Sequence, residues 1–361
     1  MSIPMPADGP SGRRRRSFVP PLRTRTTTDP ATDQTSEPEN RDTLAATAAR
    51  ETGWAAADTR RRAQLLLAAI WLLDGVLQYQ PFMFTKDFGS QVLAPTAQGN
   101  PAVIADPITW AARIVTDHPV GPNAAFATIQ LLLGLAIAWR PTVKAALAAS
   151  VVWSLAVWWL GEGLGGVLTG AANPLNGAPG AVILYALIAV LVWPTDRTDG
   201  PFPAARPVGL GAARGLWFVL WGSLAYFTMQ SANTDGQAMH DMIADMAQGQ
   251  PGWLAAIGNH AATLVAGRGL TASIVLAVAL AVVAVGVFLP VRLAALYRAT
   301  LVLALVVSAV IWVVGEDLGG LFGGQGTDPN SGPVLALLLW LYWPKPTMTT
   351  NSTDMTEATK R

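Results

Sequence analysis

The amino-acid sequence predicts an all-α, polytopic membrane protein with eight transmembrane helices arranged in two parallel four-helix repeats. The first observation is composition: 52% of the 361 residues are hydrophobic and 13% are charged, whereas soluble domains carry about 25% charged residues. The second is a series of eight apolar stretches, and the third is a collinear set of matches between the two halves. The chain has no cysteine, which excludes disulfides and thiolate metal sites.

Two polar segments flank the apolar part of the chain. Residues 1–58 and 345–361 are rich in Thr, Pro or charge and have almost no apolar periodicity, so we expect both to be disordered cytoplasmic tails. The first tail contains the run Arg13–Arg16. These arginines either form a solvated tail that marks the cytoplasmic side or contact anionic lipid heads.

The apolar stretches divide into repeat A, residues 59–200, and repeat B, residues 201–344. A membrane-crossing helix needs about 20 predominantly apolar residues, and most of the stretches satisfy this. The fourth and the eighth are short. The stretches lie roughly at 62–84, 122–140, 144–162, 179–194, 212–232, 270–290, 296–316 and 332–344.

Matching residues recur at nearly constant offsets. "AQGNP" at 97–101 matches "AQGQP" at 247–251, and Trp193 matches Trp343, both 150 residues on. Lys144 matches Arg298 at an offset of 154. Half B therefore has four extra residues between its second and third helices and loses them again around its last. Such a series predicts an internal duplication, and an even number of spans per half predicts parallel repeats related by an axis along the membrane normal.

The distribution of Lys and Arg predicts the orientation. One set of connections contains most of the basic residues, among them Arg60–Arg62, Arg140 and Arg214, whereas the opposite set contains only Lys86, Arg113 and Arg268. By the positive-inside rule both termini are cytoplasmic in a multi-pass protein of a bacterial plasma membrane. The segments 106–116 and 251–267 read as amphipathic helices on the outer surface, with Trp110 and Trp253 as interface anchors.

Two acidic, glycine-rich segments follow the third and the seventh stretch. "GEGLGGVLTGAANPLNGAP" (161–179) and "GEDLGGLFGGQGTDPNSGP" (315–333) share Gly, Glu, Leu, Gly, Gly, Gly, Asn and Pro, eight of nineteen positions in a gapless alignment. Because the helices after them are short, we expect each loop to fill the outer part of the membrane. Irregular backbone at that depth requires protein or a water-filled cavity around it.

A polar stripe precedes each loop at helical spacing. Glu162 and Glu316 end these stripes, and each glutamate either caps its loop or forms a ligand or ion site. The candidate ligand-binding residues of the two halves are Ser154, Trp158, Glu162 and Asn176, and Ser308, Trp312, Glu316 and Asn330.

Asp74 is the most conspicuous single acid. It lies twelve residues beyond Arg62, roughly 18 Å into the bilayer. An acid at that depth faces the bundle and is a functional candidate by default. Gln78 lies one turn further on the same face, and Leu224 occupies the equivalent position in half B. A protonated Asp74 bonded to a neighbouring helix is the structural alternative.

The segment "QAMHDMIADMAQGQPGW" suggests a possible Cu(I) site, because thioether and imidazole ligands suit that ion. Its candidates are Met239, His240, Met242 and Met246. Methionines at this spacing more often fill an apolar face, so no metal is the main expectation. The sequence contains no P-loop, dinucleotide fingerprint, nucleophile elbow or H-E-x-x-H motif, and no enzymatic activity is predicted.

The four-helix unit, with Arg62 and Gly75 in its first helix, resembles the DoxX-like family of small bacterial membrane proteins. That family shows Arg and then Gly-x-x-Lys in the first helix, whereas Gln78 stands at the Lys position here. The resemblance covers about one helix per half plus the four-span count. It implies a tandem duplication of the family's four-helix bundle and a link to quinone or thiosulfate chemistry.

The predicted function is therefore that of a DoxX-like plasma-membrane protein with an outward-facing polar pocket that binds a small ligand, a quinone or a lipid. One alternative is a proton- or ion-coupled secondary transporter with Asp74 as the carrier. Another is the membrane subunit of a redox enzyme, with quinone as its cofactor. The expected partners are the lipid bilayer and a second membrane protein, and no nucleic acid.

Overall fold

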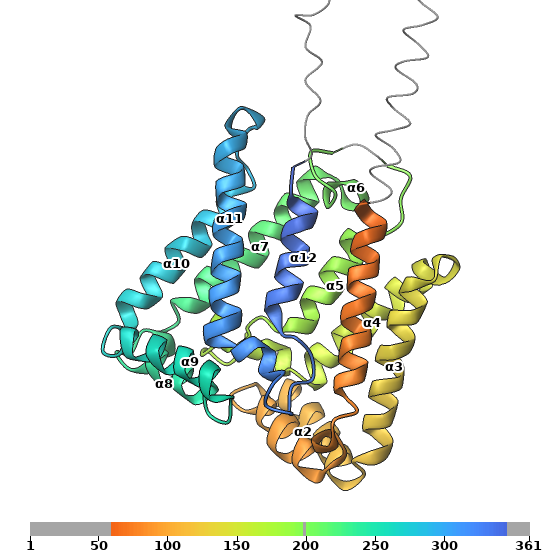
Figure 1. The fold of residues 1–361 in the computed structure, drawn as a ribbon, viewed down its shortest axis with the longest axis vertical. Coiled ribbons are helices and arrows are strands. Elements are labelled where there is room, and N and C mark those ends of the chain that lie inside the picture. The colour runs from red at the N-terminus through yellow and green to blue at the C-terminus, as the bar shows by residue number, and fades with distance from the viewer. Residues whose placement is uncertain (1–58, 198–199, 345–361) are drawn as a thin grey trace, which may run out of the picture. The chain divides into compact units, whose positions relative to one another are not determined.

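The computed structural model describes residues 59–197 and 200–344, which contain helices and no strand (Figure 1). The predicted tails, 1–58 and 345–361, lie outside the described residues. The described residues belong to one compact unit. An all-helical protein is thus confirmed for this part of the chain.

All eight predicted apolar stretches contain a helix. The first half contains a helix over residues 59–77, then α2 (Ala102–Asp117), α3 (Val120–Ala138), α4 (Val143–Leu160) and α5 (Ala181–Leu191). The second half contains α6 (Ala205–Val208), α7 (Leu210–Thr228), α8 (Ala238–Met246), α9 (Gly252–Val265), α10 (Gly269–Gly286), α11 (Ala294–Val310) and α12 (Ser331–Tyr342).

Four helices of the described residues are long and apolar enough to cross a membrane: Val120–Ala138, Arg140–Leu160, Gly269–Gly286 and Ala294–Gly315. This indicates a membrane protein. α5 and α12 are equally apolar but have only 11 and 12 residues, about 17 and 18 Å of helix. The helix over 59–77 contains four charged residues, Arg60–Arg62 and Asp74, and is not one of these four.

The basic start of the first helix binds the ends of its neighbours. Arg61 donates to the carbonyl oxygen of Ile137 at 3.0 Å and also to that of Ala138. The Gln64 amide donates to the carbonyl oxygen of Val192 at 2.9 Å. These carbonyls lie at the carboxyl ends of α3 and α5. The last carbonyl groups of a helix have no intrahelical partner, and a positive charge is favourable beside them. The first helix therefore begins where α3 and α5 end.

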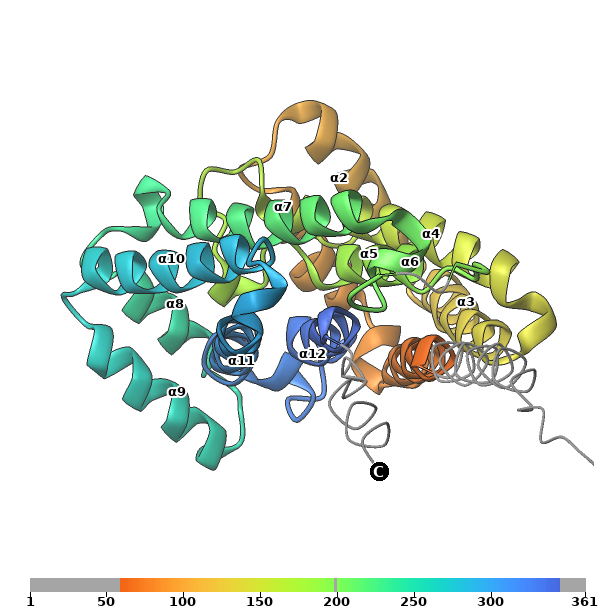
Figure 2. The same ribbon diagram turned by 90° about the horizontal axis from the view of Figure 1, so that it is seen from above.

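The second half has the same arrangement at the same end. The hydroxyl of Tyr342, at the end of α12, donates to the carbonyl of Ala213 at 2.6 Å. Trp217 donates its indole N–H to the carbonyl of Val283 at 2.9 Å. α7 therefore begins beside the ends of α10 and α12. α5 and α12 contact each other, and Figure 2 shows them at the centre between the α3–α4 and α10–α11 pairs.

The opposite end contains α2, α8, α9 and the two glycine-rich loops (Figure 1). A turn of π-helix, η2 (Phe88–Leu93), joins the first helix to this layer. Trp110 on α2 and Trp253 on α9 are 64% and 55% exposed, as expected of residues that anchor a surface helix at an interface.

Candidate ligand pocket and paired loops

Each glycine-rich loop begins with four consecutive residues in the left-handed region. In the first loop, φ is 56° for Gly163, 56° for Leu164, 61° for Gly165 and 68° for Gly166. In the second, the residues Asp317–Gly320 have φ values of 44°, 57°, 76° and 64°. Residues other than glycine adopt this region only at a cost of about 1–2 kcal/mol each. The repeated glycines are therefore explained by a left-handed turn.

The turn packs directly on the chain that enters the next helix. A Cβ atom on Gly165 would lie 2.0 Å from the carbonyl oxygen of Pro179, and one on Gly319 would lie 2.6 Å from the carbonyl carbon of Pro329. By contrast, a Cβ on Gly166 would have no neighbour closer than 3.7 Å. Gly165 and Gly319 are thus needed for close approach as well as for their backbone angles.

A tryptophan fixes the same point in each loop. The indole N–H of Trp158 donates to the Pro179 carbonyl at 2.6 Å, and that of Trp312 donates to the Pro329 carbonyl at 2.8 Å. These two bonds span 21 and 17 residues. The second loop is therefore four residues shorter than the first between the tryptophan and the proline. The gapless alignment of the two loops matches the structure only over the left-handed turns, before these four residues are lost.

The glutamates accept hydrogen bonds from the first turns of the following helices. Glu162 Oε1 accepts from the backbone N–H of Val182 at 3.1 Å, and Glu316 Oε2 accepts from that of Ser331 at 3.1 Å. A helix amino terminus has unpaired N–H groups and favours negative charge. The second oxygen of each carboxyl, Glu162 Oε2 and Glu316 Oε1, is buried and has no hydrogen-bond partner in the described residues.

Each loop also binds the opposite half of the molecule. The Asn233 amide, after α7, donates to the carbonyl of Ala172 in the first loop at 2.8 Å. The Gln80 amide, after the first helix, donates to the carbonyl of Gly326 in the second loop at 3.0 Å. The second loop thereby contacts the first half of the molecule.

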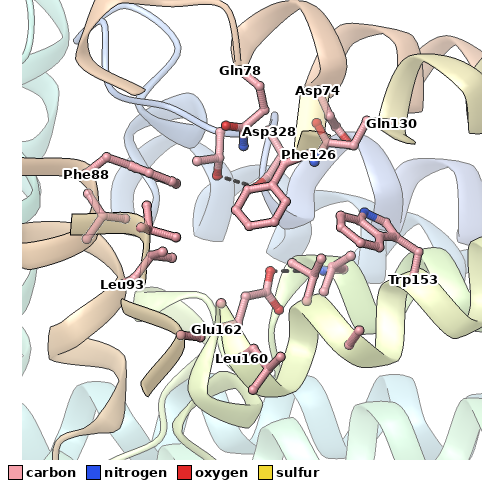
Figure 3. Close-up of a pocket in the computed structure, with 18 of the residues that line it drawn as sticks. Asp74, Gln78, Phe88, Leu93, Phe126, Gln130, Trp153, Leu160, Glu162 and Asp328 are labelled. Carbon is pink, nitrogen blue, oxygen red and sulfur yellow. Dashed lines mark hydrogen bonds between the residues drawn. The ribbon is translucent and has the colours of Figure 1, made fainter. Parts of the chain in front are cut away.

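A cavity of about 220 Å³ lies among the helices of the first half (Figure 3). The second loop contributes Thr327 and Asp328 to its wall. The remaining lining comes from the first half: Trp71, Asp74, Gln78, Phe88, Val92, Leu93, Ala111, Val115, Phe126, Gln130, Trp153, Ala156, Val157, Leu160, Gly161, Glu162, Val182 and Tyr185. The cavity is therefore mainly apolar and aromatic, with a few polar groups that point into it.

Three carboxyl groups line this cavity, those of Asp74, Glu162 and Asp328, and no Lys, Arg or His does so. Asp74 is 2% exposed, and its Oδ1 accepts from the Tyr185 hydroxyl at 3.4 Å. In Figure 3, Gln130 lies beside Asp74, and Glu162 approaches from the opposite side. The cavity therefore has acidic groups on facing walls.

Two amide side chains complete the polar lining. Gln78 and Gln130 are 4% and 7% exposed, and the Oε1 atom of each has no hydrogen-bond partner in the described residues. The indole N–H of Trp153 is also buried without a partner. Because buried polar atoms are nearly always hydrogen-bonded, a cluster of unpaired ones around one cavity is typical of a binding site.

Burial changes the acidity of the loop carboxyls, which lie outside the four membrane-crossing helices. Burial, and then the charge of Asp328, raises the pKa of Glu162 to about 8. Burial likewise raises the pKa of Glu316 to about 8 and that of Asp317 to about 6. The pKa of Asp328 is raised by burial, against hydrogen bonds that favour its ionised form. Glu162 and Glu316 therefore hold their protons near neutral pH.

A second, more polar cavity of about 420 Å³ lies on the other side of Thr327 and Asp328. Glu316 lines this cavity, not the first one. Its other polar lining residues include Gln248, Gln250, Gln325 and Asn330. The two glutamates thus border two neighbouring cavities separated by the second loop.

The structure brings together three of the predicted site residues, Asp74, Gln78 and Glu162. The others lie elsewhere. Ser154 is buried outside the cavity wall, and its hydroxyl has no partner in the described residues. Trp158 and Trp312 hold the loops, as described above. α4 presents Trp153, Ala156, Val157 and Leu160 to the cavity, so the predicted polar stripe ends at the cavity but does not line it.

The predicted loop asparagines have different positions. Asn176 accepts from the backbone N–H of Asn173 in a capping box of the turn η6 (Pro174–Asn176). Asn330 is the N-cap of α12, where its Oδ1 accepts from Ser331 N–H at 2.9 Å. Ser308 donates to the carbonyl of Ala304 within α11. None of these three residues lines the first cavity.

The methionine and histidine candidates lie on α8. Met239 is buried in the core, and Met242 packs against it. Met246 lines the second cavity, while His240 pairs with the neighbouring Asp241 at 2.9 Å. Within the described residues, no three His, Asp or Glu side chains are clustered as metal ligands.

Three important lining residues were not predicted from the sequence. Gln130 is a lone amide inside an apolar span, and this signal would have identified it. Tyr185 lies in a continuous apolar run and gives no signal. Asp328 reaches the cavity only because the second loop folds over the first half, which residue spacing does not reveal.

Comparisons with protein-family models, with curated proteins and with solved structures give no match to this chain. The chemistry of the cavity is therefore the basis on which a function is assigned.

Proposed function

We propose that this is a multi-pass plasma-membrane protein that binds a small molecule in the cavity of its first half. The observation that carries the proposal is the cavity itself: a largely apolar space with three carboxyls in its wall and several unpaired polar atoms among its lining residues. Ligand sites are commonly concave and apolar, with a few convergent polar groups. Burial of so many unpaired groups is costly without a ligand.

We propose further that the eight apolar helices form two parallel four-helix repeats. Burial along α3 and α10 supports this, because residues 150 apart are buried together: Asn123 with Ser273, Ala127 with Ala277, Gln130 with Leu280, Leu133 with Val283 and Ile137 with Val287. The matching left-handed turns and tryptophan hydrogen bonds support the same relationship.

On this reading the two halves differ at the cavity. Leu224, Leu280 and Leu335 stand 150 residues beyond Asp74, Gln130 and Tyr185, and all three leucines are at most 2% exposed. The second half thus fills with leucine the space that the first half lines with polar groups. We propose that one repeat binds the ligand and that the other supplies the loop with Asp328.

The proposed orientation places both termini in the cytoplasm and the loops outside. The basic residues around Arg60–Arg62 lie at the end of the bundle opposite the two loops, which supports it. We retain a DoxX-like duplicated bundle as part of the proposal. The proposed ligand classes include a quinone or a lipid.

Native mass spectrometry of the full-length protein in mild detergent tests the binding function. We expect a small molecule to remain bound to the unmodified protein and to be absent from the double variant Asp74→Leu, Gln130→Leu, which copies the second half. A correctly folded double variant that retains the same bound molecule would contradict the assignment of the cavity.

A second candidate function is proton- or ion-coupled transport. The specific observation in its favour is that acidic groups on facing walls of one cavity, Asp74 and Glu162, can exchange a proton for a ligand. Reconstituted vesicles test this: uptake of the co-purified molecule should collapse with the proton gradient and with Asp74→Asn. Uptake that survives both would exclude coupling.

A further inference from the structure

We infer that the ligand of this cavity is a small organic cation, an ammonium compound that carries an apolar or aromatic body. This inference rests on the proposed binding function and adds the class of ligand. Three independent features of the lining lead to it: the sign of its charges, the character of its walls and the position of its unpaired polar atoms.

The first feature is charge. The cavity has three carboxyls on different elements: Asp74 on the first helix, Glu162 after α4 and Asp328 in the second loop. None of its lining residues is a Lys, Arg or His, and no salt bridge to any of the three carboxyls is present among the described residues. Three carboxyls around one cavity, without a basic neighbour, repel one another when ionised, so a cation is the partner that stabilises their ionised form.

The second feature is the aromatic wall. Trp71, Phe88, Phe126, Trp153 and Tyr185 line the cavity. The faces of aromatic rings attract cations, and aromatic enclosure is the common way to bind a quaternary ammonium group. An inorganic cation keeps or replaces its water with oxygen ligands and gains little from such walls. The combination therefore favours an organic cation over a metal ion or a proton alone.

The third feature is a set of unpaired acceptors. Gln78 Oε1, Gln130 Oε1 and Glu162 Oε2 are buried and have no hydrogen-bond partner in the described residues. Gln78 and Gln130 lie with Asp74 on one wall. An ammonium N–H group would satisfy these acceptors, whereas a quinone carbonyl is itself an acceptor and could pair only with a donor such as the unpaired indole N–H of Trp153.

Binding of 2-phenylethylammonium, measured by calorimetry on the full-length protein in lipid nanodiscs, tests the inference. Its neutral isostere propylbenzene has the same shape without the charge or the N–H groups. We expect the cation to bind at least about tenfold more tightly than the isostere. At pH 9, above the pKa of about 8 of Glu162, Asp74→Asn and Glu162→Gln should each weaken cation binding by about 30-fold or more, the usual effect of removing one member of a charge pair that is shielded from water.

Asp317→Asn is the matched control, because Asp317 is a fully buried loop acid that lines neither cavity. We expect it to leave cation binding unchanged. Equal affinity for the cation and the isostere, or no loss in Asp74→Asn and Glu162→Gln, would overturn the inference. If only neutral molecules bind, and Asp74→Leu, Gln130→Leu abolishes that binding, the cavity still functions as a site but the class of ligand is wrong.

Discussion

The indole Nε1 of Trp158 donates a hydrogen bond to the main-chain carbonyl of Pro179 at 2.6 Å. The bond ties α4 to the residue pair before α5, and Trp312 makes the same bond to Pro329 in the second half. Each tryptophan thereby closes a loop whose backbone turns in the left-handed sense. The position of the glutamate at the mouth of each loop depends on this closure.

Trp158→Phe and Trp312→Phe should each lower the thermal unfolding midpoint in detergent, because each leaves a carbonyl without its donor. The expected cost is about 1–2 kcal/mol per bond. Trp159→Phe is the matched control, since Trp159 is 39% exposed and makes no such bond. Equal losses in Trp158→Phe and Trp159→Phe would show that ring size, not the bond, matters.

Gly165→Ala should destabilise the protein severely, whereas Gly166→Ala should have a mild effect. Both positions have a positive φ, so both substitutions bear the strain of a left-handed side chain, about 1–2 kcal/mol. Only Gly165 has a carbonyl oxygen 2.0 Å from the place of a Cβ. Yield of folded protein by size-exclusion chromatography and its unfolding midpoint provide the comparison. Similar behaviour of the two variants would contradict the close approach.

Trp71→Phe and Trp221→Phe should have opposite effects on stability. Trp71 donates its indole N–H to the buried hydroxyl of Ser150 at 2.9 Å, so its replacement leaves that hydroxyl unpaired. The indole nitrogen of Trp221 is buried without a partner in the described residues, so its removal relieves a cost of burial. Unfolding midpoints should fall for Trp71→Phe and stay level or rise for Trp221→Phe. A large loss in Trp221→Phe would imply a partner for its N–H.

The stability of the protein should fall as pH rises through the range from about 4.5 to about 8. The folded-state pKa values of Glu162 and Glu316 are raised from 4.5 to about 8, so the folded state binds more protons than the unfolded state in this range. Stability is therefore greatest below the lower value and is lost up to the higher one. Unfolding midpoints in a pH series measure this. The double variant Glu162→Gln, Glu316→Gln should flatten the fall, and an unchanged slope would contradict it.

Single cysteines should test the proposed orientation, since the natural chain has none. Gln325 in the second loop and Arg197 after α5 are both exposed. In intact cells, Gln325→Cys should react with a membrane-impermeant maleimide, and Arg197→Cys should react only after the cells are opened. The reverse pattern would invert the proposed topology.

The sequence was sufficient for those properties that depend on local composition and on repetition. Long apolar stretches such as 122–140 predicted helices because a helix pairs all its backbone polar groups within one segment away from water. All eight stretches contain a helix. Asp74 and Gln78 were recognisable because polar residues in an apolar helix face inward. The sequence left open whether Glu162 caps its loop or forms part of a site. In the structure, Glu162 Oε1 accepts a hydrogen bond from the first turn of α5, and Glu162 also lines the cavity.

Tertiary structure alone decided which distant residues meet. Asp328 lies more than 160 residues from Glu162 in the chain, yet both line one cavity, because Gln80 holds the second loop against the first half. The matched Glu316 lines another cavity, although the residues directly around it, GEDLGG, match GEGLGG at five of six positions. The spacing of residues predicts the face of a helix on which each residue lies. Which other helix or loop contacts that face depends on the packing of the whole chain, and residue spacing does not encode this packing.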